Sequence, residues 1–259
     1  MHQLVKYIGF FFTAGKGSII ARHAGFAADL YNNCLKSSKH STNRTAERIR
    51  KQVCRSGEVI EVTDYGAGTR KKLSANRPVS KIMRQTAINR KSGQVLAALA
   101  AYFKPKLLIE LGTGPGISTM YLAGGNPSAS IITIEGSREI ARLAERNFVK
   151  AGYQNIVLRE GRFSEILPAV LSVPGHPLMV FIDGDHRENS LLENISMLSS
   201  SIQDDSIIII DDIHLSQEME RAWKKIIAMP EVRLSIDLFR LGLLFFREEM
   251  QKQHLMLKI

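Results

Sequence analysis

The 259-residue chain has only two cysteines, Cys34 and Cys54. Two thiols are too few for a disulfide framework or a four-thiolate zinc site, so we interpret them as free thiols of a reducing compartment. No apolar run approaches the roughly 20 residues that span a bilayer. The nearest, residues 7–14, lacks the basic start and the length of a signal peptide. With 44% hydrophobic side chains, the chain is expected to be a soluble, cytoplasmic, globular protein.

Acidic residues are scarce in the first part of the chain. Residues 1–106 hold 20 Lys and Arg but only 5 Asp and Glu, a balance of +15, whereas residues 107–259 have a balance of −5. In the basic stretch from Arg44 to Lys91 the only aromatic residue is Tyr65, which disfavours a surface that stacks single-stranded bases. The basic part would attract phosphates or acidic partners, although a solvated helical face carrying surplus cations explains the same charge.

The first 87 residues give weak signals and are predicted to form a basic, mainly helical extension that acts as a cap or lid. Residues 19–35 and 79–90 indicate helices, and 59–63 indicate a short strand. Residues 65–72, which combine Tyr, Gly and Thr with three cations, indicate a basic loop.

From residue 88 to 259 the sequence predicts one α/β domain. Short β-branched apolar runs alternate with helical segments, which is typical of a doubly wound, mostly parallel sheet. An antiparallel hairpin of residues 232–238 and 243–247, turning at Gly242, is expected to finish the chain. The predicted strands are residues 107–109, 131–134, 156–158, 178–182 and 207–210, and the predicted helices are residues 93–103, 118–123, 138–151, 164–171, 187–198 and 216–229.

Ligands of such sheets lie beyond the carboxyl ends of the strands. After the first of these strands, Gly112, Gly114 and Gly116 allow a tight turn and close approach of a ligand. A dinucleotide fingerprint would need glycine or alanine where Ile117 stands, and the carboxylate of Glu110 would repel a pyrophosphate. These residues therefore favour a nucleoside without phosphates that carries a cationic amino group. Glu135, at the end of the next strand, is suited to ribose hydroxyls, as in both NAD and adenosylmethionine enzymes.

Three further motifs follow the later strands: Gly161-Arg162-Phe163, Phe181-Ile-Asp-Gly-Asp-His186 and Ile210-Asp-Asp-Ile-His214. In this order the five motifs resemble class I S-adenosylmethionine-dependent methyltransferases, in particular the catechol O-methyltransferase type and its bacterial relatives. The resemblance covers residues 88–247. It implies a Rossmann-like methyltransferase fold, S-adenosyl-L-methionine as cofactor, and O-methylation of a small hydroxylated substrate.

The resemblance also assigns the cofactor-binding residues. The glycine turn with Thr113 would cradle the methionine part, above Glu110, and Ser118 would hold the cofactor carboxylate. Glu135 and Gly136 would bind the ribose. Gly161, Arg162 and Phe163 would border the adenine, with Arg162 larger than the residue usual there, and Asp183 would also lie beside the cofactor.

Metal-dependent members of the family take acidic or amide ligands from the positions of Asp183, Asp211 and Asp212. Such oxygen ligands suit Mg²⁺ or another divalent cation, which would lower the pKa of a substrate hydroxyl. His186 replaces the catalytic lysine of the catechol enzymes and is, with Asp183, a candidate catalytic residue. His214 is a second candidate base or ligand. Structural roles stay open: Asp183 as a turn residue, Asp211 and Asp212 as helix caps, and His186 as a surface histidine.

Two alternatives to a small-molecule enzyme remain. The first is a nucleic-acid or protein methyltransferase that docks through its basic first part, although it lacks the Asn-Pro-Pro-Tyr-type element that amino-methylating nucleic-acid enzymes carry after the fourth strand. The second is a non-catalytic scaffold of the same fold, for instance as a subunit of a homodimer.

Overall fold

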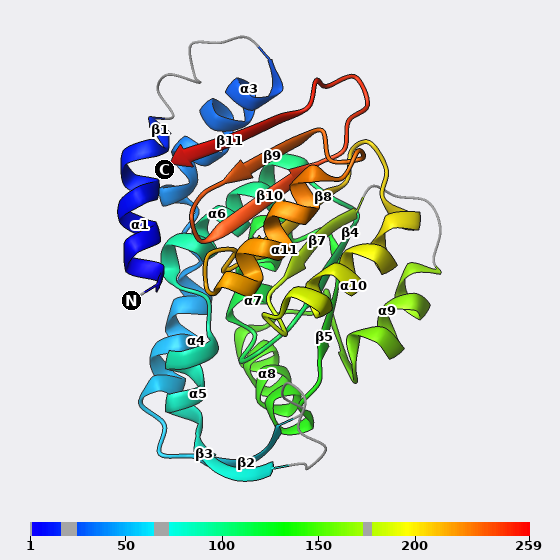
Figure 1. Cartoon of the computed structure of the whole chain (residues 1–259). Coiled ribbons are helices and arrows are strands. Elements are labelled where there is room, and N and C mark those ends of the chain that lie inside the picture. The colour runs from blue at the N-terminus through cyan, green and yellow to red at the C-terminus, as the bar shows by residue number, and fades with distance from the viewer. Residues whose placement is uncertain (1, 17–24, 65–72, 173–177) are drawn as a thin grey trace. The chain divides into compact units, whose positions relative to one another are not determined.

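The computed structural model describes residues 2–16, 25–64, 73–172 and 178–259. The chain forms two compact units, Met1–Ser38 with Pro174–Ile259, and Lys39–Val173; their elements are labelled in Figure 1. Residues 39–87 thus belong to the same compact unit as residues 88–173. The division at residue 87 into a cap and a catalytic domain remains a prediction about function. The predicted basic loop at 65–72 lies outside the described residues.

The Lys39–Val173 unit has a parallel ladder of three strands in the order β4-β5-β6. Leu111 pairs with Ile134, and Glu135 pairs with Glu160, so the carboxyl ends of these strands lie at one edge. Each strand coincides with one of the predicted apolar runs, which confirms these three predictions. The strands are β4 (Leu107–Leu111), β5 (Ser130–Glu135) and β6 (Ile156–Glu160), and the helices between and around them are α6 (Arg90–Phe103), α7 (Ile117–Gly125), α8 (Arg138–Ala151) and α9 (Phe163–Leu171).

The rest of this unit is a helical and hairpin layer: α4 (Arg44–Cys54), β2 (Val59–Asp64), β3 (Leu73–Pro78) and α5 (Val79–Thr86). The strands β2 and β3 pair antiparallel; β3 was not predicted. The predicted helix at 79–90 is two helices in the structure, because α5 ends at Thr86 and Asn89 caps α6 by accepting from the Ser92 N–H at 3.0 Å.

In the other unit the strands run in the order β1-β11-β9-β10-β8-β7. The pairs β7–β8, β9–β11 and β1–β11 are parallel, whereas β10 is antiparallel to both of its neighbours. The strands are β1 (Gly15–Lys16), β7 (Leu178–Ile182), β8 (Ile207–Asp211), β9 (Leu234–Asp237), β10 (Leu241–Phe245) and β11 (Gln253–Lys258), with α1 (His2–Thr13), α3 (Phe26–Asn33), η1 (Leu35–His40, which continues into the other unit), α10 (Glu188–Leu198), η2 (Ser199–Ser201) and α11 (Gln217–Ala228).

The class of fold is confirmed: it is α/β with mostly parallel strands and an antiparallel hairpin near the C-terminus. Two details were wrong. Gly242 lies inside β10, opposite Asp237, and its Cβ would lie 2.6 Å from the Trp223 ring, so this glycine serves packing and not a turn. The hairpin also does not finish the chain, because β11 follows it and pairs with β9.

The helix predicted at residues 19–35 is present in the described part of that range, but its bounds differ. Within residues 19–35 the structure describes α3 at Phe26–Asn33, followed by the 3-10 helix η1 from Leu35. Among the described residues no helix combines the length and the apolarity that a bilayer crossing requires.

Candidate active site

The glycine turn after β4 has the backbone that its sequence requires. Gly112, Gly114 and Gly116 have φ angles of 100°, 51° and 86°, in the left-handed region that favours glycine. The turn is held from below by Asn147, whose side-chain amide donates to the Pro115 carbonyl at 2.9 Å. A Cβ on Gly116 would collide with the Phe148 ring. The turn is therefore fixed by packing on one side.

Its other side is more open. An ideal Cβ on Gly114 would meet nothing closer than the Thr86 hydroxyl at 3.7 Å. Thr86 is the last residue of α5, so the N-terminal layer reaches the glycine turn within the Lys39–Val173 unit. This arrangement leaves the Gly114 backbone accessible at close range, as a ligand cradle requires.

Glu135 is bound to the glycine turn. Its Oε2 accepts from the Gly114 N–H at 2.9 Å, and its Oε1 accepts from the Ser137 N–H at 2.9 Å. Burial raises the pKa of Glu135, while hydrogen bonds from the backbone of Ser137, Gly114 and Gly136 oppose this rise. Each carboxylate oxygen retains a second lone pair, so the side chain can also accept from a vicinal diol.

Glu110 lies under the turn and is fully buried. Its Oε2 accepts from the hydroxyls of Thr119 and, at 2.6 Å, of Thr133, whereas Oε1 makes no hydrogen bond to a described residue. Burial raises the pKa of Glu110 to about 7, although the nearby hydroxyl of Ser118 and those of the two threonines favour the charged form. An orphaned carboxylate oxygen beside an open turn suits a cationic group.

The predicted adenine border lies at the ends of β5 and β6. The Gly161 N–H donates to the Glu135 carbonyl at 3.0 Å, and an added Cβ on Gly136 would lie 4.0 Å from the Gly161 carbonyl oxygen. Phe163 begins α9 and is partly exposed, while Arg162 is exposed. The structure therefore brings Glu110, the three glycines, Glu135, Gly136 and Gly161 to one edge of one unit.

The acidic candidates lie in the other unit, where Ile182 of β7 pairs with Ile210 of β8. Asp183 and Asp211, which follow these residues, share a hydrogen bond. Burial and the charge of Asp212 raise the pKa of Asp211 to about 7, while the hydrogen bond with Asp183 opposes this rise. Asp212 has a left-handed φ of 51° and lies 3.3 Å from the Arg240 guanidinium.

The predicted metal triad is therefore not assembled. Asp183 and Asp211 share a hydrogen bond, and Asp212 is paired with Arg240. Within the described part of the chain, no three His, Cys, Asp or Glu side chains are grouped so that they could hold a metal ion. These residues as arranged do not fit a divalent cation. The capping role considered for Asp211 and Asp212 is also wrong, since Ser216 caps α11 by accepting from the Met219 N–H at 3.2 Å.

His186 lies beside this pair. Its Nε2 is 3.6 Å from Asp183 Oδ1. Burial lowers the pKa of His186, against the opposing charges of Asp212 and Asp185. The imidazole is therefore neutral near pH 7 and able to accept a proton.

His214 is engaged in a second cluster that the sequence did not reveal. Its Nε2 lies 2.7 Å from Asp237 Oδ2, and its Nδ1 lies 3.5 Å from Glu220 Oε1. Burial alone would lower the pKa of His214, but these two carboxylates raise it above its ordinary value. His214 is thus held between two carboxylates as a structural partner more than as a free base. The pattern at the end of β9 gave no signal that Asp237 would meet a histidine 23 residues earlier.

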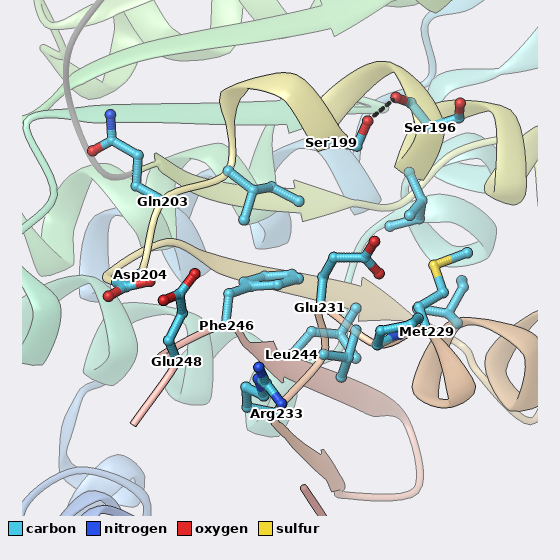
Figure 2. Close-up of a pocket in the computed structure, with 15 residues that line it drawn as sticks. Ser196, Ser199, Gln203, Asp204, Met229, Glu231, Arg233, Leu244, Phe246 and Glu248 are labelled. Atoms are coloured by element: carbon cyan, nitrogen blue, oxygen red, sulfur yellow. Dashed lines mark hydrogen bonds between the residues drawn. The ribbon is translucent and has the colours of Figure 1, made fainter. Parts of the chain in front are cut away.

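The Met1–Ser38 and Pro174–Ile259 unit also contains a cavity of about 630 Å³ (Figure 2). Its wall includes Ile202, Leu244 and Phe246, and its acidic residues are Asp204, Glu231 and Glu248. Phe245 pairs with Ile207, the first residue of β8. The cavity thus lies at the amino end of β8, opposite to Asp211, and contains none of the predicted site residues.

Comparisons with known proteins agree with this geometry. Residues 109–213 match a family model described as a methyltransferase domain. A catechol O-methyltransferase of Niastella koreensis is 33% identical over 102 residues, covering 38% of this chain and 46% of the relative. A catechol O-methyltransferase of Mycobacterium tuberculosis is 28% identical over 129 residues, covering 49% and 57%. The chain therefore spans about half the length of the curated relatives it matches.

An O-methyltransferase from Bacillus cereus solved with SAH is 17% identical, with a TM-score of 0.59; the match covers 83% of this chain and 99% of that one. This likeness shows the fold. Together with the sequence relatives, it confirms the predicted resemblance to S-adenosylmethionine-dependent O-methyltransferases.

The buried Glu110 carboxyl predicts a specific dependence of stability on pH. Its pKa is about 7 in the folded chain against an ordinary 4.5, so between these values the folded state holds a proton that the unfolded state releases. Its contribution to stability is full below 4.5 and is lost as pH rises through about 7. Relative to Glu110→Gln, the wild type should lose about 2 to 3 kcal/mol of unfolding free energy between pH 5 and pH 8.

Urea denaturation at both pH values measures this difference. Glu145, an exposed carboxylate on α8, gives the matched control, because Glu145→Gln should change with pH in parallel with the wild type. Parallel behaviour of Glu110→Gln and the wild type would show that Glu110 titrates normally.

Proposed function

We propose that this chain, whose residues 109–213 match a model of a methyltransferase domain, transfers a methyl group from S-adenosyl-L-methionine to a hydroxyl group of a small molecule. The observation that carries the proposal is the glycine turn whose Gly114 N–H is bound by Glu135 and beneath which Glu110 is buried with an unpartnered oxygen. Two carboxyl groups around one turn disfavour a pyrophosphate and favour a cationic nucleoside.

In this proposal the Lys39–Val173 unit holds the cofactor. Glu135 and Gly136 take the ribose, and the open faces of Gly161 and Phe163 border the adenine, with Arg162 at its exposed rim. When bound, S-adenosylmethionine supplies a methyl group that its sulfonium already activates. The chain contributes alignment, which is worth up to about 7 to 11 kcal/mol in well-oriented reactions. The methionine part rests on Gly112, Thr113, Gly114 and Gly116, with Ser118 at its carboxylate and Glu110 toward its amino group.

The acceptor chemistry is assigned to His186 and Asp183. A neutral His186 imidazole removes the proton of the acceptor hydroxyl at Nε2, which makes the oxygen a better nucleophile. Asp183 Oδ1, 3.6 Å from that nitrogen, stabilises the imidazolium that results. No step is routed through a metal, because Asp183, Asp211 and Asp212 are not arranged to hold one. The cap role of residues 1–87 and a homodimer remain predictions.

Removing one charge at the ribose position should weaken cofactor binding. Glu135→Gln loses a charge-assisted hydrogen bond to a hydroxyl, which is worth about 1.5 to 3 kcal/mol, or roughly 10- to 100-fold in Kd for S-adenosylhomocysteine. Isothermal titration calorimetry measures this Kd. Glu160→Gln is the control, because it removes the same charge from the residue that pairs with Glu135 on the next strand, and its Kd should equal that of the wild type. A wild type that binds no S-adenosylhomocysteine at millimolar concentration would contradict the proposal as a whole.

Loss of the base should slow transfer without affecting the cofactor. With catechol as the probe acceptor, chosen because the two curated relatives are named for it, His186→Gln should reduce kcat at pH 7 by roughly 10²- to 10⁴-fold. Its Kd for S-adenosylhomocysteine should be unchanged. His40→Gln, at an exposed histidine, should retain wild-type kcat. An unchanged kcat in His186→Gln would remove this residue from the mechanism.

Removal of divalent ions by a chelator tests whether a metal assists methyl transfer, as the sequence predicts. From the arrangement of the three aspartates, we expect methyl transfer to catechol to persist in excess EDTA and to be unaffected by added Mg²⁺. Activity that is lost in EDTA and restored by Mg²⁺ would show that Asp212 leaves Arg240 and joins the other two carboxylates around an ion. Asp212→Asn and Arg240→Gln would then change the Mg²⁺ concentration needed.

A further inference from the structure

The exposed face of α4 consists of cations. Arg44, Arg48, Lys51 and Arg55 (the C-cap residue) follow one another at intervals of four, three and four residues, and all four are exposed. This spacing places them along one stripe of the helix. We call these four residues the α4 stripe.

Among the residues that the structure describes, the α4 stripe has no charge partner. Among the described residues, none of its side chains makes a hydrogen bond or an ion pair. The one acid of the helix, Glu47, is turned away from the stripe: it accepts from the Tyr121 hydroxyl at 2.9 Å and pairs with Arg50 at 3.2 Å. Like charges at helical neighbours cost about 0.2 to 0.5 kcal/mol per pair, so the stripe destabilises the helix that carries it.

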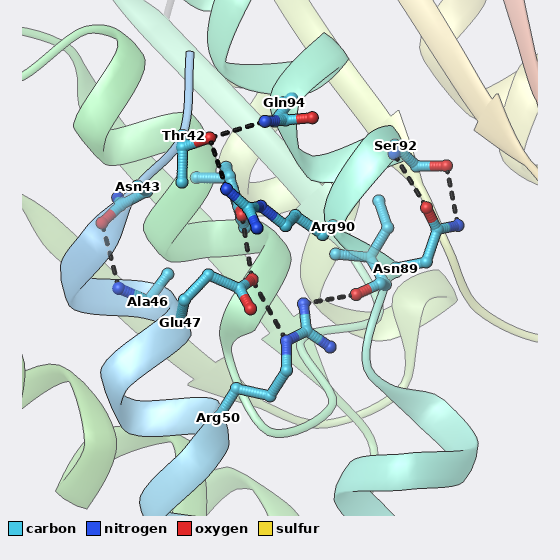
Figure 3. Close-up of polar contacts among 11 residues, drawn as sticks. Thr42, Asn43, Ala46, Glu47, Arg50, Asn89, Arg90, Ser92 and Gln94 are labelled. Carbon is cyan, nitrogen blue, oxygen red and sulfur yellow. Dashed lines mark hydrogen bonds and ion pairs between the residues drawn. The ribbon is translucent and has the colours of Figure 1, made fainter. Parts of the chain in front are cut away.

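That helix is nevertheless firmly attached. Asn43 caps it by accepting from the Ala46 N–H at 3.0 Å, and the Asn43 amide donates to the Met120 carbonyl at 2.6 Å. Arg50 donates to the Ile88 carbonyl at 2.6 Å, as part of the polar network that Figure 3 shows between α4 and the start of α6. Ala46, Ile49 and Val53 are buried. The cations therefore project from a rigid support.

The surroundings reinforce the positive charge. The guanidinium of Arg84, from α5, donates to the Cys54 carbonyl at 2.8 Å and so lies at the end of the stripe. Residues 39–173 contain 22 Lys and Arg against 10 Asp and Glu. The positive potential is thus a property of this whole unit, with the α4 stripe as its ordered linear part.

We propose that the α4 stripe binds the phosphate backbone of a double-stranded nucleic acid, independently of its sequence. The line of cations from Arg44 to Arg55 covers 11 helical rises, or about 16 Å, the axial length of about five phosphates of one strand. Three of the four cations are arginines, whose planar guanidinium matches phosphate oxygens. Among the described residues, α4 carries no aromatic side chain on which unpaired bases would stack. Contacts of cations with phosphates carry no sequence information, so the contact is electrostatic.

A membrane surface fits this face less well. Helices that bind at a bilayer interface insert an apolar face beneath a basic one. In α4 that apolar face is packed inside the protein, against α5, α7 and α8, so it is not available to lipid.

The test uses the full chain and a 20-base-pair mixed-sequence RNA duplex, with the same sequence as DNA, in fluorescence anisotropy at 50 and 200 mM salt. Four phosphate contacts predict a slope of log K against log salt of about −3.6, which is roughly a 100-fold loss of affinity between the two concentrations. Arg44→Gln, Arg48→Gln, Lys51→Gln and Arg55→Gln combined should weaken binding at 50 mM at least tenfold and flatten the slope.

The matched control carries the same loss of four charges elsewhere: Lys36→Gln, Lys104→Gln, Lys106→Gln and Lys224→Gln, all at exposed positions. It should keep the wild-type slope. Thermal unfolding checks that both variants are folded, and the double variant Arg48→Gln, Lys51→Gln replaces the quadruple one if that one unfolds. The proposal is overturned by a wild type that binds neither duplex at 50 mM salt, by equal losses in the control, or by binding to phosphatidylserine vesicles without binding to either duplex. None of these outcomes depends on methyl transfer.

Discussion

Burial of the Glu110 carboxyl group is the constraint on which the Lys39–Val173 unit depends. Water is excluded from it, so its negative charge must be balanced by donors or removed by a proton. Thr119 and Thr133 provide donors for one oxygen only. The hydroxyls come from α7 and β5, so the same bonds fix the helix that follows the glycine turn and the strand that ends in Glu135. A buried acid thus organises three elements around a space that favours positive charge.

Glu135 completes this arrangement from the neighbouring strand. By accepting from Gly114 and Ser137, it joins the turn after β4 to the turn after β5. The N-terminal layer supports the same turn from outside, because Thr86 lies next to Gly114 and Asn43 binds the Met120 carbonyl on α7. Residues 39–87 therefore support the edge that carries the glycine turn and also carry the α4 stripe.

The sequence predicted those features that depend on neighbours along the chain. Apolar runs located β4 to β8, and the amphipathic pattern of residues 138–151 matched α8 from end to end. The three glycines of the turn and Glu135 could be predicted because they belong to short motifs whose residue types indicate their chemistry. Features that depend on distant residues were missed. Gly242 was taken as a turn because glycine is common in turns, yet its role is to admit Trp223 against β10. The strand β3, which contains Ser, Asn, Arg and Pro, has no apolar alternation and forms by pairing with β2.

The acidic residues show the same limit and explain how the two units differ in charge. Residue types and spacing placed three aspartates at two strand ends but did not determine which partner each carboxylate would contact. Asp212, which has a left-handed backbone, pairs with Arg240. Asp237 pairs with His214, and Lys6 pairs with Glu220. The Met1–Ser38 and Pro174–Ile259 unit thus neutralises its charges internally. In residues 39–173, Glu47, Glu58 and Glu160 pair with Arg50, Arg146 and Arg138. Among the described residues the four cations of the α4 stripe have no acid paired with them, so the excess positive charge of this unit is exposed. Composition already shows the excess of cations in residues 39–173. The structure adds which of the described cations form an exposed line without acid partners, because pairing depends on residues that are distant in the sequence.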